Sequence, residues 1–182
     1  MNSPSDNLAE MAASRLLSTE RLELFLLSLA DAPMILSLLN EPSFIANIGD
    51  RQVRNLAQAQ QYLLNGPLAS YQQHGFGLYK VVLKETLEPI GLCGLVKRDF
   101  LAAPDLGYAL FPAYCGKGLA TEATRAVYAY AKQELALSQV MAIVLASNQP
   151  SVRVLENVGL KRAGQIQSPQ TLELLDLYVE NN

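Results

Sequence analysis

The spacing of apolar residues changes from helical to strand-like and back along the chain. Partial alternation over residues 19–27 predicts a first strand, and apolar residues then recur at helical spacing over 28–40 and 56–73. The second helical stretch contains Gly66 and Pro67. A proline inside a helix removes a hydrogen bond and crowds the preceding turn. We therefore expect this helix to be broken near these two residues.

The middle of the chain is dominated by strand-like runs. Residues 76–83 and 90–97 are two such runs joined by a short polar turn, and a third follows over 106–111. Three consecutive strands with short connections predict an antiparallel meander.

The last third of the chain alternates between helix and strand. A long helix is expected from Gly118 to about Leu135, followed by the continuous apolar run 140–145, which is typical of a buried central strand. Residues 148–158 predict a short helix, and 172–179 a last strand. The whole pattern predicts an α/β domain with a mixed sheet.

Length and composition favour one globular domain. The chain has 182 residues, of which half are apolar and 17% charged, enough for one sizeable core. No apolar run approaches the roughly 20 residues that span a bilayer. Residues 1–14 lack the apolar core of a secretory signal. We expect a flexible leader over 1–14, a single domain over 15–182, a cytoplasmic location and no membrane partner.

Charge and reactive side chains exclude several function classes. The net charge of −3 argues against nucleic-acid binding, which usually needs a clustered basic face. His74 is the only histidine, and the chain has no G-x-S-x-G motif for a serine hydrolase. One histidine with the scattered Cys93 and Cys115 does not make a zinc site, so no metal is expected. Without a secretion signal, free thiols are favoured over a disulfide.

The segment between the third strand and the long helix has the chemistry of an anion site. Gly116 and Gly118 flank Lys117 just before the helix, and glycine lets the backbone turn sharply and approach a ligand. The first amides of a helix have no internal acceptor and lie at its positive end, so they can hold a pyrophosphate. On spacing alone, a helix start that uses glycine for its turn is the better interpretation.

A polar pair, Asn148 and Ser151, follows the apolar run 140–145. Side chains at the carboxyl end of a central strand are well placed to contact a ligand. Helix capping explains each residue equally simply, since both types are favoured at helix starts.

Three segments together resemble the GNAT family of N-acetyltransferases. They are Asp105–Tyr108 (DLGY), Phe111–Ala123 (FPAYCGKGLATEA) and Asn148–Leu160 (NQPSVRVLENVGL). The opening Thr19–Leu22 (TERL) resembles the RimJ/RimL-like branch, which acetylates the N-termini of ribosomal proteins. The order and spacing match over roughly residues 17–180, which is far more specific than any single segment.

The resemblance implies a fold and a co-substrate. The fold is a mixed, largely antiparallel sheet with a splayed parallel strand pair, flanked by helices. The pair would be 106–111 and 140–145, with the pantetheine arm of acetyl-CoA in the gap and the thioester carbonyl on a backbone N–H near Leu110. The resemblance assigns these residues to acetyl-CoA binding: Leu110, Phe111, Cys115, Gly116, Lys117, Gly118, Leu119, Ala120, Asn148 and Ser151.

The implied chemistry is direct attack of a neutral amine on the thioester, which needs no covalent nucleophile. Cys115 is therefore expected to be a small apolar filler whose backbone amide helps to hold the pyrophosphate. Many relatives protonate the leaving thiolate with a tyrosine four residues after Ser151, where this chain has Leu155. Ser151, Tyr114 or a water is expected to take that role. Asp105 is the candidate general base, with a turn residue as the equal alternative.

The acceptor is an amine, either on a protein N-terminus or on a small metabolite or antibiotic. We expect its site within residues 25–75 and the hairpin tips, as a wide acidic groove for a protein or a closed pocket for a metabolite. Leu155 also favours an alternative, a module that binds acyl-CoA without turnover. A monomer and a homodimer are both compatible with the sequence.

Overall fold

The computed structural model describes residues 15–181, and the expected leader over 1–14 lies outside them. Their strands form one sheet in the order β1-β2-β3-β4-β5-β6-β8-β7, in which only β5 and β6 are parallel neighbours. The strands are β1 (Arg15–Ser18), β2 (Leu22–Leu26), β3 (Leu78–Leu83), β4 (Glu88–Val96), β5 (Asp105–Leu110), β6 (Met141–Val144), β7 (Lys161–Gln167) and β8 (Leu174–Val179). The expected meander is β3-β4-β5, and the predicted α/β fold with a mixed sheet is confirmed.

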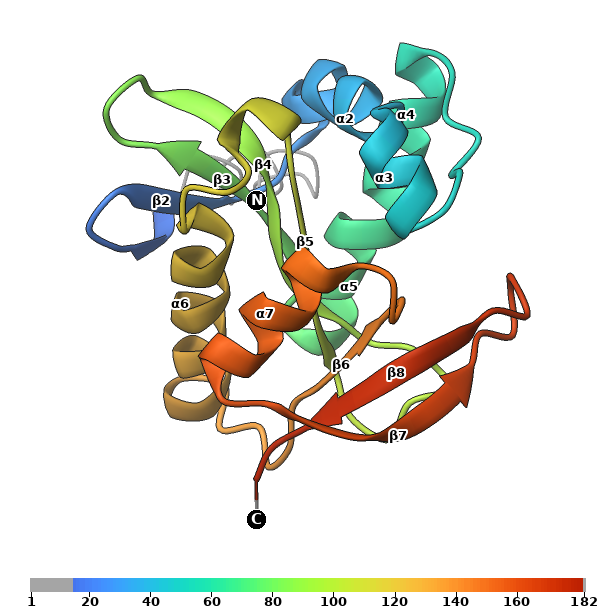
Figure 1. Cartoon of the computed structure of the whole chain (residues 1–182). Coiled ribbons are helices and arrows are strands. Elements are labelled where there is room, and N and C mark those ends of the chain that lie inside the picture. The colour runs from blue at the N-terminus through green and yellow to red at the C-terminus, as the bar shows by residue number, and fades with distance from the viewer. Residues whose placement is uncertain (1–14, 182) are drawn as a thin grey trace.

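Helices cover both faces of the sheet (Figure 1). They are η1 (Leu29–Asp31), α2 (Ala32–Leu39), α3 (Pro42–Asn47), α4 (Leu56–Leu63), η2 (Leu64–Leu68), α5 (Ala69–His74), η3 (Pro112–Tyr114), α6 (Leu119–Gln133) and α7 (Gln149–Val158). In β4, the Cys93 sulfur lies 3.7 Å from the Thr124 hydroxyl of α6. Its neighbour Leu92 lines a cavity beneath α4. Adjacent strand residues face opposite ways, so α6 and α4 lie on opposite faces.

The centre of the sheet is buried on both sides. Ile90, Leu92, Cys93 and Leu95 of β4 are each at most 2% exposed. Burying one such aliphatic side chain contributes about 1.5–3 kcal/mol. This double coverage explains why β4 is a nearly continuous apolar run.

The expected break at Gly66 and Pro67 is wrong. The two residues lie in η2, a π-helical turn that continues α4 directly into α5. A π-turn widens the helix by one residue, which accommodates the missing N–H and the ring of Pro67 within the continuous helix. The bulge also lines a cavity described below.

Three elements escaped the sequence pattern. The strand expected over 19–27 begins only at Leu22, and a separate edge strand, β1, precedes it. The other unpredicted strand, β7, is the opposite edge of the sheet and is largely exposed, so its sequence (KRAGQIQ) carries little apolar alternation. The helix α3 has only six residues, too few to show a helical period.

The parallel strands β5 and β6 pair at one position and then separate. Asp105 is paired with Met141, and the Met141 N–H donates to the Pro104 carbonyl over 2.9 Å. Beyond this bridge β6 pairs along its length with β8 instead. The predicted splayed parallel pair is confirmed.

Candidate active site

The cleft between β5 and β6 is lined by backbone groups of β5. The Phe111 N–H donates to the Ile90 carbonyl of the neighbouring strand over 2.9 Å. Because backbone groups of successive strand residues alternate in direction, those of Tyr108 and Leu110 point the other way, toward β6. The Leu110 N–H therefore faces the cleft as expected, whereas the Phe111 N–H is already used within the sheet.

A tyrosine and a serine hydroxyl meet in this cleft. The cleft has a volume of about 330 Å³, and its lining includes Tyr108, Asn148, Ser151 and Leu155. The Tyr108 hydroxyl donates to the Ser151 hydroxyl oxygen over 2.7 Å. Burial raises the pKa of Tyr108 to about 12, so this phenol keeps its proton at neutral pH. Asn148 both caps α7, by accepting from the Ser151 N–H over 3.3 Å, and lines the cleft.

Asp105 is the buried acid of the same cleft. Its side chain is 2% exposed and accepts from the Arg98 Nε over 2.9 Å. Burial raises the pKa of Asp105 to about 6, against the opposing charge of Arg98. Asp105 is the first residue of β5 rather than part of a turn. At neutral pH it is a carboxylate that can accept a proton.

The loop before α6 presents free backbone amides. Gly116 and Gly118 adopt left-handed φ angles of 73° and 76°, as the glycine pattern predicted. The N–H groups of residues 116–121 donate to no acceptor among the described residues. The expectation for Cys115 is wrong. Its N–H donates to the Pro112 carbonyl over 3.2 Å, and its side chain is exposed rather than packed as a small apolar filler.

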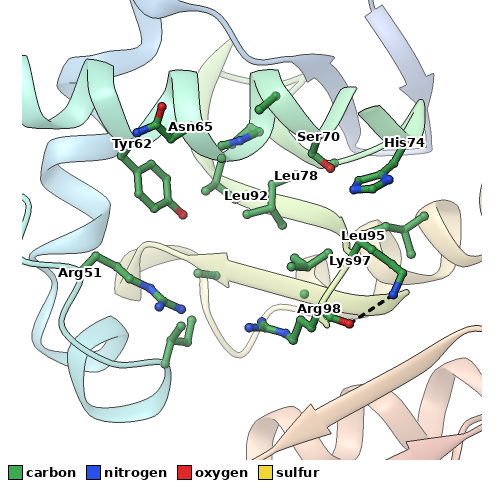
Figure 2. Close-up of a pocket in the computed structure, with 18 of the residues that line it drawn as sticks. Arg51, Tyr62, Asn65, Ser70, His74, Leu78, Leu92, Leu95, Lys97 and Arg98 are labelled. Carbon is green, nitrogen blue, oxygen red and sulfur yellow. Dashed lines mark hydrogen bonds between the residues drawn. The ribbon is translucent and has the colours of Figure 1, made fainter. Parts of the chain in front are cut away.

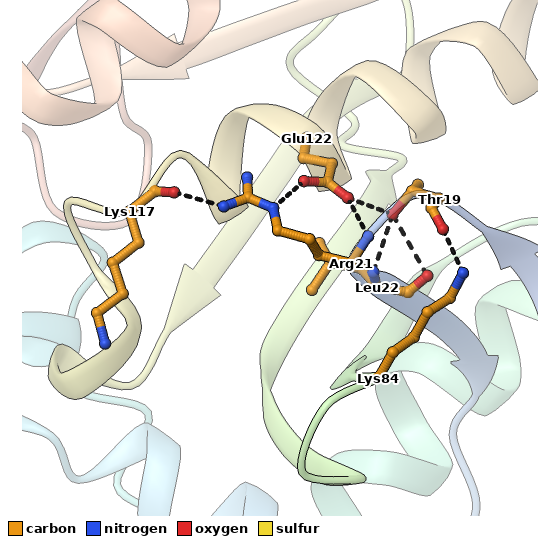
Figure 3. Close-up of polar contacts among 6 residues, drawn as sticks. All are labelled: Thr19, Arg21, Leu22, Lys84, Lys117 and Glu122. Atoms are coloured by element: carbon orange, nitrogen blue, oxygen red, sulfur yellow. Dashed lines mark hydrogen bonds and ion pairs between the residues drawn. The ribbon is translucent and has the colours of Figure 1, made fainter.

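The loop is tied to the β1–β2 turn by a polar cluster (Figure 3). Glu122 accepts from the Thr19 hydroxyl (2.6 Å), and from the N–H and Nε of Arg21 (2.8 and 2.7 Å). The Arg21 Nη1 also donates to the Lys117 carbonyl over 2.9 Å. Burial acts to raise the pKa of Glu122, but the hydrogen bonds outweigh it and lower that pKa. Glu122 therefore braces the loop as an ionised carboxylate.

Tyr114 lies away from both hydroxyls of the cleft. Its own hydroxyl donates to Glu88 over 2.7 Å, and the Lys117 amine lies 5.7 Å from the centre of its ring. It lines neither the cleft nor the cavity beside it. The geometry thus favours Tyr108, which sequence reasoning did not single out, over Tyr114 as the partner of Ser151.

A second cavity of about 360 Å³ adjoins the cleft, and the two share Ile48, Arg51, Arg98, Gly107 and Tyr108. One wall comes from α3, α4, η2 and α5, within the range 25–75, and the other from β3, β4, β5 and the turn between β4 and β5, which carries Lys97 and Arg98. Figure 2 shows Arg51 and Arg98 on the floor opposite the helix that carries Tyr62. No aspartate or glutamate is among the described residues that line it. It is not the acidic groove expected for a protein terminus.

Comparison with known proteins places the chain in a family. A family model described as an acetyltransferase (GNAT) domain matches residues 21–161, more than half of the chain. The chain belongs to the GNAT family. It is an N-acetyltransferase, and the three segments that carried the resemblance are the strand β5, the loop with α6, and α7. Within residues 15–181 of this GNAT enzyme, every helix is too short or too polar to cross a membrane.

Relatives of this GNAT enzyme match it over most of their length. An uncharacterised N-acetyltransferase, p20, of Bacillus licheniformis is 27% identical over 90% of this chain and 93% of its own. The crystal structure of an acetyltransferase from Agrobacterium tumefaciens superposes with a TM-score of 0.76 at 26% identity, over 91% and 94% of the two chains. RimL, a ribosomal L7/L12 α-N-protein acetyltransferase solved with coenzyme A, shares the fold (TM-score 0.79, 15% identity, 92% and 97% covered).

Proposed function

We propose that this enzyme transfers an acetyl group from acetyl-CoA to a primary amine by direct attack in a ternary complex. The observation that carries the proposal is the meeting of two spaces at Gly107 and Tyr108: the cleft between β5 and β6, and the adjoining cavity. Two substrates can therefore approach one point from opposite faces of the sheet. The fold shared with RimL, which was solved with coenzyme A, supports this co-substrate.

Acetyl-CoA is held mainly by backbone groups in this proposal. The pyrophosphate lies on the free amides of Gly116–Ala120 at the positive end of α6. The pantetheine arm follows β5 in the cleft, within reach of the Asn148 amide. The Leu110 N–H polarises the thioester carbonyl and stabilises the oxyanion that forms when the amine attacks.

Tyr108 and Ser151 supply the proton for the leaving group. The amine nitrogen bonds to the carbonyl carbon, the carbon–sulfur bond breaks, and the thiolate takes the Ser151 hydroxyl proton. The Tyr108 phenol, 2.7 Å away, replaces that proton. This pair can replace the tyrosine that many relatives have at the position of Leu155. It therefore favours a catalyst over a module that only binds acyl-CoA.

Asp105 is the proposed general base. It lines the cleft and is a carboxylate at neutral pH, so it can take the proton that the attacking amine loses. Because Arg98 holds one of its oxygens, a bridging water is the natural carrier between the amine and the carboxylate.

The acceptor that the cavity favours is a small amine rather than a protein N-terminus. Thr19 and Arg21 carry the resemblance to the RimJ/RimL-like branch. They contact Glu122 and Lys117 at the start of α6 and do not line the cavity. The resemblance to this branch therefore supports acetyl-CoA binding more than it supports a protein N-terminus as the acceptor. A single domain over 15–182, a cytoplasmic location and the monomer or homodimer stay predictions from the sequence.

A thiol-release assay tests the proposal. The protein is mixed with acetyl-CoA and a panel of small amines and N-terminal peptides, and free coenzyme A is measured. We expect amine-dependent thiol release with at least one small amine. Tight binding of coenzyme A without release across the panel favours a binding module, and no heat in a calorimetric titration with millimolar coenzyme A contradicts the proposed site.

A further inference from the structure

The cavity that adjoins the cleft carries an uncompensated positive charge. Arg51 is half-buried in its lining and forms no hydrogen bond or ion pair with any described residue. Arg98, on the opposite part of the floor, uses only its Nε, in the bond to Asp105. A partly desolvated guanidinium group without a partner is costly. The unpaired Arg51, with the unused Nη groups of Arg98 beside the same cavity, points to an anion bound there.

The hydroxyl of Tyr62 faces the same space. Burial raises the pKa of Tyr62, and the charges of Arg51 and Arg98 oppose that rise. All three residues line the cavity. Figure 2 shows the Tyr62 ring descending from its helix toward the two arginines. The hydroxyl bonds to no described residue. Two cations and one free hydroxyl donor thus converge from three separate elements.

Among the described residues, nearby carboxylates leave Arg51 without a counter-charge. Asp50 precedes Arg51 in the chain but pairs with Arg54, and Asp105 lies in the adjoining cleft with its charge shared with Arg98. The exposed Lys97 and His74 at the cavity add donors but no negative charge. A polycationic amine would be repelled by Arg51 and Lys97 in this cavity.

We propose that the acceptor is a small amine that also carries a carboxylate or phosphate group, bound by Arg51 and Arg98. The inference rests on the proposed function, because it assigns the acceptor of that same site. The guanidinium fork of Arg51 matches the two oxygens of such an anion. The apolar walls formed by Leu78 and Leu92 accept the carbon skeleton of the molecule. The amine then reaches the cleft at Tyr108.

The test compares matched ligands that differ only in the anion. L-Phenylalanine is paired with L-phenylalaninamide, and phosphoethanolamine with ethanolamine, so the two arms separate a carboxylate from a phosphate. Each is titrated calorimetrically into protein saturated with coenzyme A, and kcat/KM is measured with acetyl-CoA. In at least one arm we expect the anionic member to bind about tenfold or more tightly than its neutral partner.

Variants of the arginine decide whether the preference comes from this cavity. In Arg51→Ala the preference should fall below about threefold, and Arg51→Glu should reverse it. Arg15→Ala is the control, because Arg15 pairs with Glu23 on the sheet edge and lines neither the cavity nor the cleft. It should leave the preference unchanged.

Two results overturn the inference. One is that neutral members, or the polycation spermidine, bind as tightly as the anionic members or more so, including the case in which no anionic probe gives heat. The other is a preference that survives Arg51→Ala. Failure of the proposed function is a separate observation, since it appears as no binding of coenzyme A or no thiol release with any amine. An enzyme that acetylates only neutral amines keeps the function and loses this acceptor.

Discussion

The proposed acetyl-CoA site relies mainly on backbone groups, whereas the cavity beside it is defined by side chains. The amides of residues 116–121 and of Leu110 belong to the turn and strand of one continuous segment. Arg51 and Arg98 come from two different loops and Tyr62 comes from the helix α4. In this proposal, backbone groups bind the constant co-substrate, acetyl-CoA, and side chains select the acceptor amine.

The largest expected effect is on the affinity for acetyl-CoA of the loop before α6. Gly118→Trp should weaken acetyl-CoA binding at least about 100-fold, because a bulky side chain would distort the loop that presents the free amides and, starting 3.4 Å from the Arg21 Nη2, would displace the arginine that holds this loop. The left-handed φ of 76° at this position adds strain of about 1–3 kcal/mol. Calorimetric titration with coenzyme A measures the affinity, and thermal unfolding measures the strain.

A second glycine separates lost binding from lost stability. Gly75 ends α5 with a φ of 75°, and a Cβ placed there meets nothing within 4 Å. Gly75→Trp should therefore cost similar stability and leave the affinity for coenzyme A unchanged. If both variants lost coenzyme A equally, the loop before α6 would not be the phosphate site.

The same contrast explains what the sequence could predict. The glycine loop, the cap at Asn148 and the splayed strands are local or follow from strand order, so spacing and a family resemblance located them. The bulge at Pro67 was missed because a local rule forbids proline in a helix, whereas the π-turn keeps the helix continuous. Tyr108 and Arg21 were missed because their partners lie on other elements, and Arg51 because it joins the other cavity-lining residues only in the folded chain. No spacing within one segment reveals such contacts.

A smaller effect is expected where the two regions meet. Tyr108→Phe should lower kcat by about 10²-fold and leave the KM for acetyl-CoA nearly unchanged, because it removes a proton source and little binding. Ser151→Ala should lower kcat at least as much, since its hydroxyl is the donor nearest the cleft. Steady-state kinetics check both. A full kcat in Tyr108→Phe together with a loss in Tyr114→Phe would restore the tyrosine that the sequence suggested.

Asp105 should set the acid limb of the pH profile. Its pKa is raised to about 6, so it gains its proton, and loses its function as a base, as the pH falls through about 6. The ratio of kcat/KM in wild type to that in Asp105→Asn should be constant above this pH and decline below it. Taking the ratio cancels the ionisation of the acceptor amine. A ratio independent of pH would leave Asp105 only the structural role of holding Arg98.

The smallest effect is expected from Arg21, which holds the loop before α6 from the β1–β2 turn. Arg21→Ala removes the Nε bond to Glu122 and the Nη1 bond to the Lys117 carbonyl, keeps the backbone bond to Glu122, and removes no group proposed to touch the thioester. Because the Arg21 side chain is 44% exposed, the loss should be about 1 kcal/mol, which is about a fivefold rise in the KM for acetyl-CoA with kcat retained. Arg15→Ala, which breaks the exposed pair with Glu23 on the sheet edge, should change neither constant. A fall in kcat without a change in KM would mean that the loop positions the reacting carbonyl. The backbone groups of the loop would then act in the chemical step and not only in the binding of acetyl-CoA.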